Sequence, residues 1–85
     1  MSDNTESKSE PLIAVEAFIR DEEGNLQTVY GPAEETGEAR AVAAAMSLIS
    51  SHDGVIAWVR EINSALGEYG ERRILFQAGE VPEME

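Results

Sequence analysis

The sequence contains no cysteine, only six basic residues and few aromatic ones among its 85 residues. Without cysteine there can be no disulfide framework, no thiolate zinc site and no cysteine nucleophile. The six basic residues face seventeen acidic ones, which gives a formal net charge of −11. Because phosphate binding requires a basic surface, and anionic membranes repel an acidic one, we expect no direct binding to nucleic acid or membranes.

Long apolar segments are absent as well. No run approaches the roughly 20 residues that span a bilayer, and the polar, acidic first ten residues lack the basic and apolar regions of a signal peptide. We therefore expect a cytoplasmic protein. Composition predicts a disordered acidic tail over residues 1–11, one compact domain over 12–80 and a short tail over 81–85. A core this small is only marginally stable, which favours a homodimer.

Two short segments at the start of the domain predict an antiparallel hairpin. Leu12–Arg20 and Leu26–Tyr30 are rich in β-branched and aromatic residues, which is typical of strands. Between them lies Asp21–Asn25, whose Gly24 favours a tight turn. Gly31 and Pro32 are expected to end the second strand.

A helix is predicted over Glu38–His52, with Thr36 as its N-cap. The alanine-rich centre has high helix propensity, and the expected buried stripe follows helical spacing through Val42, Ala45, Met46 and Ile49. The single histidine, His52, lies in the last turn, where it favours the helix dipole.

The segment Val55–Ile62 can be interpreted as a strand or as part of a second helix continuing to Tyr69. Its β-branched content and the preceding Gly54 favour the strand. A long loop over Asn63–Gly70 and a last strand over Arg72–Ala78 then follow. The resulting order, β-β-α-β-β, predicts an α+β fold in which one helix packs on one face of a four-stranded antiparallel sheet.

One helix is too narrow to cover four strands. The opposite face of the sheet is therefore expected to remain partly bare and to carry Phe18 and Trp58 as an apolar interface.

The acidic residues gather in the first half of the chain, where ten of the first 38 residues are acidic and two are basic. Two clusters are expected at opposite ends of the second strand, about 17 Å apart if that strand has five residues. They comprise Asp21, Glu22 and Glu23 at one end and Glu34, Glu35 and Glu38 at the other. These carboxylates could bind a basic partner, or simply keep a small protein soluble.

Nothing in the sequence specifies a catalytic, metal or cofactor site. Serines 47, 50 and 51 lie too close to His52 in the chain to form a convincing nucleophile and base. Asp21–Asn25 fails the calcium-loop pattern, and no glycine-rich phosphate motif is present. We therefore expect no enzymatic activity, no cofactor and no metal.

The expected function is that of a small, acidic, non-catalytic protein-interaction domain. In its sharper form the protein inhibits a basic partner by mimicking a nucleic-acid backbone. The alternative is a small-molecule-binding homodimer with a pocket between the sheet and the 63–70 loop, using Arg60 and Tyr69. Arg60 belongs with Arg72 and Arg73 to a basic group that could capture an anion or pair with Glu61 or Glu71 across the sheet.

Overall fold

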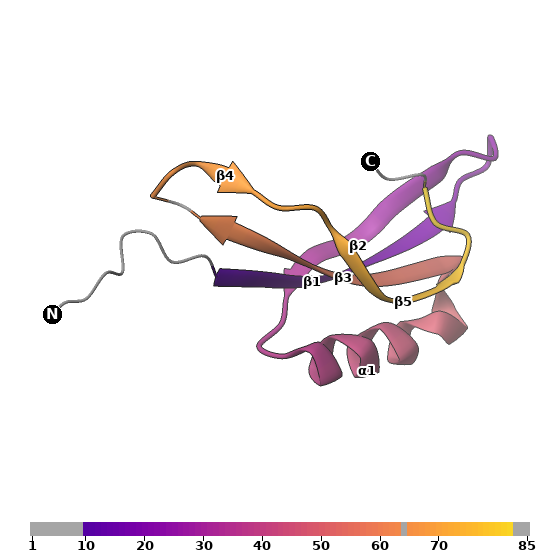
Figure 1. Ribbon diagram of the computed structural model, residues 1–85. Helices are drawn as coiled ribbons and strands as arrows, with labels where there is room; N and C mark the ends of the chain where they lie inside the picture. The colour runs from indigo at the N-terminus through magenta and orange to yellow at the C-terminus, as the bar shows by residue number, and fades with distance from the viewer. Residues whose placement is uncertain (1–9, 64, 83–85) are drawn as a thin grey trace, which may run out of the picture.

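The computed structural model describes residues 10–63 and 65–82. It confirms the predicted α+β fold, with one helix on an antiparallel sheet (Figure 1). Residues 1–9 and 83–85, on which most of the two predicted tails fall, lie outside the described residues. The elements in chain order are β1 (Glu10–Arg20), β2 (Leu26–Glu34), α1 (Glu38–Leu48), the 3-10 turn η2 (Ile49–Ser51), β3 (Gly54–Asn63), β4 (Glu68–Tyr69) and β5 (Arg73–Gly79).

The sheet places β1 and β3 at its centre. β2 pairs with β1, and β1 pairs with β3. On its other side β3 pairs first with β5, along Gly54–Val59, and then with the short β4 at Ile62 and Asn63. Every pairing is antiparallel. Val55–Ile62 therefore lies in a strand, which confirms the preferred interpretation, and the alternative helix over that segment does not form.

The main core lies between the helix and the sheet. Alanines at 41 and 45 of α1 are fully buried, and their small side chains allow the helix to lie close to β1 and β3. The helix is rotated about its axis relative to the prediction, because two residues of the predicted apolar stripe are exposed, Met46 by 55% and Ile49 by 41%. The helix turns its smallest face to the sheet and leaves the larger side chains outside.

The two ends of the helix also differ from the prediction. The N-cap is Gly37, in extended conformation, in place of the predicted Thr36, and no side-chain hydrogen bond caps this end of the helix. At the other end α1 stops at Leu48 and tightens into η2. With eleven residues, this helix is too short to cross a membrane, and it is the longest among the described residues.

The second face of the sheet is covered, contrary to the prediction. Phe18 is 1% exposed and Trp58 is 3% exposed. They form a second buried cluster with Ala14 and Ile56, against which Leu12, Leu26 and Val81 pack. The prediction that Phe18 and Trp58 lie on a bare apolar face is therefore wrong, since the sheet curls and the chain after β5 returns over this face.

The curl is produced by extra residues in β2. Between the pairs Phe18–Thr28 and Ala17–Tyr30, β2 advances by two residues while β1 advances by one. A second irregularity follows before the pair Val15–Ala33. Extra residues bend a strand and increase its twist. Gly31 and Pro32 thus bend β2, which continues to Glu34, instead of ending it at Tyr30 as predicted.

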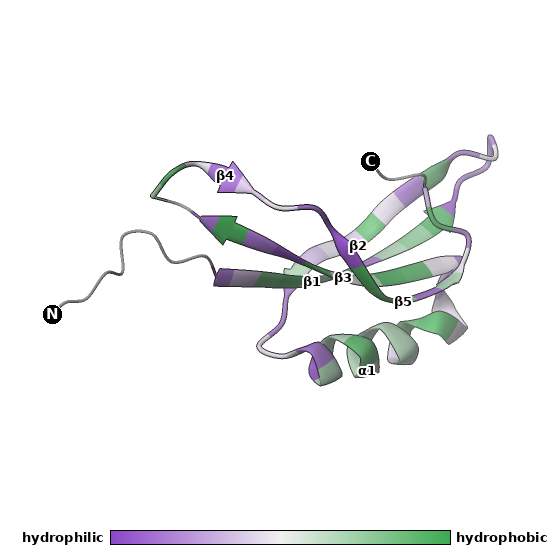
Figure 2. Ribbon diagram, in the orientation of Figure 1, coloured by the Kyte–Doolittle hydropathy of each residue, from purple (hydrophilic) through white to green (hydrophobic). Residues whose placement is uncertain are grey.

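Hydropathy follows this arrangement. Figure 2 shows apolar residues concentrated in the central strands, whereas the turn between β1 and β2 is hydrophilic.

Candidate functional site

Five of the six predicted acidic residues lie along the β2 edge of the sheet. The turn between β1 and β2 holds Asp21, Glu22 and Glu23, all exposed, Glu34 is the last residue of β2, and Glu35 follows it. Because β2 has nine residues and not five, its ends are at most about 26 Å apart. Glu38 does not join them, because it lies in the first turn of α1 and binds Arg73 at the start of β5. We call the surface from Asp21 to Glu35 the acidic edge.

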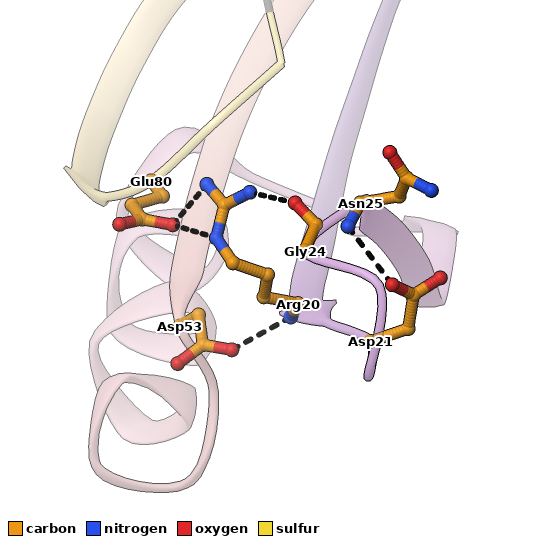
Figure 3. A network of polar contacts seen from close by, with 6 residues as sticks. All are labelled: Arg20, Asp21, Gly24, Asn25, Asp53 and Glu80. Atoms are coloured by element: carbon orange, nitrogen blue, oxygen red, sulfur yellow. Dashed lines mark hydrogen bonds and ion pairs between the residues drawn. The ribbon is translucent and has the colours of Figure 1, made fainter.

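The acidic edge contains no basic residue of its own, since none lies between Arg20 and Arg40 in the chain. Arg20 lies at one end of the edge, where it contacts the β1–β2 turn and pairs with Glu80 (Figure 3). Its Nε donates to Glu80 Oε1 at 2.8 Å, its Nη2 contacts the same oxygen, and its Nη1 reaches the carbonyl of Gly24. The guanidinium thus joins the β1–β2 turn to the chain after β5 while one carboxylate neutralises it.

The β1–β2 turn is held by the first of its carboxylates. Asp21 Oδ1 accepts the backbone N–H groups of Asn25 at 2.8 Å and Glu23 at 2.9 Å, and Oδ2 accepts Gln27 Nε2 at 3.1 Å. These hydrogen bonds, that from Asn25 foremost, hold the pKa of Asp21 below its ordinary value. The turn therefore keeps a fixed negative charge beside the free carboxylates of Glu22 and Glu23.

The middle of the acidic edge is apolar. Val29 and Tyr30 of β2 are exposed by 53% and 41%. Among the described residues β2 pairs with β1 alone, so its other side is an open strand edge. An apolar centre between charged ends resembles the arrangement of protein interfaces, where an aromatic anchor is surrounded by a polar rim.

Trp58 is fixed from two sides by charged groups. Its indole Nε1 donates to Glu16 Oε2 at 2.8 Å, and Glu16 is itself only 7% exposed. The guanidinium of Arg72 lies over the indole ring, 4.8 Å from its centroid. This network stabilises the second core and is not accessible to a partner. The charged Glu16 within an apolar strand was the sequence signal for a polar group on this face.

Arg60 and Tyr69, predicted as ligand residues, come together on the strands next to the 63–70 loop. The Arg60 guanidinium lies 5.5 Å from the centroid of the Tyr69 ring, and its Nε donates to the Gly70 carbonyl at 3.0 Å. Two hollows among the described residues lie away from this pair, one beside η2 and one beside the β1–β2 turn. The small-molecule pocket stays a prediction.

The other two arginines of the basic group have different partners from those predicted. Arg73 Nη2 binds Glu38 Oε2 at 3.1 Å, which links the start of β5 to the first turn of α1. Arg72 lies on Trp58.

His52 is the C-cap of η2 and not, as predicted, a residue of the last turn of α1, which ends at Leu48. Its Nδ1 lies 2.9 Å from the carbonyl oxygen of Leu48 and 2.9 Å from Ser51 Oγ. Asp53 does not extend this contact, since its Oδ2 accepts the Arg20 backbone N–H at 2.7 Å. The three neighbouring side chains therefore hold backbone in place, and their geometry is not that of a nucleophile, base and orienting acid.

Comparison with known proteins identifies no relative: no protein family, no curated protein and no solved structure matches this chain. The functional argument therefore depends on the acidic edge itself.

Proposed function

We propose that this protein is a non-catalytic interaction domain whose acidic edge binds a basic protein surface. The observation that carries the proposal is the run of five carboxylates from Asp21 to Glu35 with no basic residue between them in the chain. A surface of one sign raises the rate of encounter with an oppositely charged partner and repels partners of its own sign.

The structure of β2 supports binding in addition to steering. Exposed charges alone contribute little affinity, because water screens them. Val29 and Tyr30, exposed between the two acidic clusters, offer apolar surface that a partner could bury. Surfaces that bind nucleic acid are basic and include such apolar contacts, so a nucleic-acid-binding protein is the partner class that we propose. Inhibition by occupying its nucleic-acid site would follow, in a cytoplasmic setting and without catalysis.

The test compares two variants of equal charge. One replaces carboxylates of the acidic edge, with Glu22→Gln, Glu23→Gln, Glu34→Gln and Glu35→Gln. The control replaces four exposed carboxylates on β1, β3, β4 and the chain before β5, with Glu10→Gln, Glu61→Gln, Glu68→Gln and Glu71→Gln. Both variants carry four fewer negative charges than the parent chain.

Binding is measured against a panel of purified basic nucleic-acid-binding proteins, with and without competing DNA or RNA. For a true partner the edge variant should lose on the order of tenfold in affinity, about 1.4 kcal/mol. The control variant should bind as the parent does, and nucleic acid should compete. If both variants weaken binding equally, net charge and not the acidic edge is responsible, and the proposal is wrong. Binding that nucleic acid leaves unchanged would exclude mimicry.

A further inference from the structure

We propose that two copies of this chain associate through β5, antiparallel to each other about a two-fold axis, so that their sheets become continuous and their α1 helices meet above the junction. The proposal is independent of the acidic edge, which lies at the opposite side of the sheet.

The strand β5 is the second edge of the sheet. It pairs with β3 on one side and, among the described residues, with no strand on the other. An open edge presents backbone N–H and C=O groups that can pair with another chain. Seven residues, Arg73–Gly79, are enough for a strand of ordinary length.

The helix carries apolar side chains on the same side as this edge. Glu35 N donates to the Ile13 carbonyl before α1, and Asp53 N donates to the Phe18 carbonyl after it, so the helix runs in the direction of β1. Since β3 is antiparallel to both β1 and β5, the strand β5 runs in that direction too.

One row of helix residues therefore follows β5. Glu38, Val42 and Met46 succeed one another at intervals of four, and Ile49 continues their row. The row is placed on the β5 side because Glu38 binds Arg73 at the start of that strand. Its exposed members, Met46 at 55% and Ile49 at 41%, have no partner within the core clusters of the described chain. An edge strand and an apolar helix flank thus face the same neighbour.

The charges at the two ends of β5 favour a second copy of this chain as that neighbour. The strand begins next to Arg72 and Arg73 and ends next to Glu80. In an antiparallel pair about a two-fold axis, the basic start of one strand lies opposite the acidic end of the other, at both ends of the seam. Arg73 and Glu80 bind Glu38 and Arg20 within the chain but keep 66% and 56% of their side chains exposed, so each can also contact its counterpart across the seam.

The other edge cannot pair with itself in this way. Two copies of β2 placed antiparallel would bring Asp21–Glu23 of one against Glu34 and Glu35 of the other, and such like charges repel. Pro32 also interrupts a regular strand ladder along β2, because proline has no backbone N–H to donate. The fold therefore offers one edge for a copy of itself and one for a basic partner.

The test is the molar mass of the full chain in solution, measured by size exclusion with light scattering over a concentration series. The parent should rise from 9.2 kDa toward twice that mass. Met46→Glu should remain at the monomer mass, and Ile49→Glu, on the same flank, should do the same. The matched control is Val29→Glu, at a position of nearly equal exposure, 53%, on the opposite edge, and it should dimerise as the parent does.

Circular dichroism confirms that each variant is folded, which the exposure of all three positions leads us to expect. A parent chain that stays monomeric at every concentration would overturn the proposal. So would a dimer that Val29→Glu dissociates and that Met46→Glu and Ile49→Glu leave intact.

Discussion

Gly31→Ala should destabilise the protein far more than Gly24→Ala, although the two glycines have almost the same backbone conformation. Their φ angles are +85° and +86°, and placing alanine in this left-handed region costs about 1–2 kcal/mol. Around Gly24 an added Cβ would meet nothing within 4 Å. At Gly31 it would lie 2.8 Å from the Ala33 nitrogen and closer still to the carbonyl oxygen of Val15.

The difference between the variants measures how closely β2 approaches β1 at its bend. To relieve the overlap, β2 must move away from Val15, which leaves backbone groups beside the core without their partners at a cost of about 1–3 kcal/mol. We therefore expect a loss of about 1–2 kcal/mol for Gly24→Ala and about 3–4 kcal/mol for Gly31→Ala.

Urea unfolding monitored by the fluorescence of Trp58 is the assay, since this single tryptophan is buried beneath the curl. In a chain of this size each kcal/mol corresponds to roughly 4–8 °C in Tm, so thermal unfolding gives a second reading. Equal losses in the two variants would refute the close approach and, with it, the bent strand as the cause of the curl.

Two further predictions concern carboxylates. Glu16→Leu leaves the buried indole N–H of Trp58 without its acceptor and should cost about 1–3 kcal/mol in unfolding free energy. Glu16→Gln keeps an acceptor and should cost less. Equal stability of the Leu and Gln variants would contradict this role of Glu16. Asp21→Asn should lower stability near neutral pH, because hydrogen bonds, that from Asn25 foremost, lower the pKa of Asp21 in the folded chain from 3.8. A carboxyl group whose pKa is lower in the folded than in the unfolded chain stabilises the fold at pH values above its unfolded pKa. The difference in unfolding free energy between Asp21→Asn and the parent should therefore shrink as pH falls through the lowered pKa. A difference that stays constant in urea unfolding across pH would exclude this cause.

Much of the fold could be predicted from local sequence patterns. Alternation with β-branched residues identified β1 and β3, and the alanine-rich segment identified α1 from its first residue, Glu38. The same patterns could not predict how β2 continues. A Gly-Pro pair ends a strand in isolation, but here the neighbouring β1 provides a pairing partner on both sides of the bend. Long-range pairing therefore decides between a strand end and a bulge.

The burial of Trp58 could not be predicted from the sequence for the same reason. A flat sheet under one helix would have left Phe18 and Trp58 bare, whereas the bend in β2, the return of Val81 and the guanidinium of Arg72 help to close that face. The inference from a narrow helix to a bare sheet face was therefore wrong, and exposed apolar side chains lie instead at Met46 of α1 and Ile49 of η2. Hydrophobicity alone favoured these larger side chains as the buried face, whereas close packing favoured Ala41 and Ala45.

The acidic clusters could be located from sequence because turns and strand ends hold them whatever the tertiary structure. Their separation could not, since it depends on the length of β2. Arg60 and Tyr69 lie near each other because β4, which forms within the predicted 63–70 loop, pairs with β3. Their role as ligand residues stays a prediction. The partners of Arg72 and Arg73 required the structure, because residues of β3 and α1 supply them.

Recruitment of a basic partner by the acidic edge can be tested through the association rate, measured as a function of ionic strength. For a partner found among the basic nucleic-acid-binding proteins, the rate with the parent chain should fall steeply as salt rises. The variant with Gln at 22, 23, 34 and 35 should associate more slowly at low salt and show a flatter dependence, while the variant with Gln at 10, 61, 68 and 71 should follow the parent. Identical salt dependence for all three chains would contradict the claim.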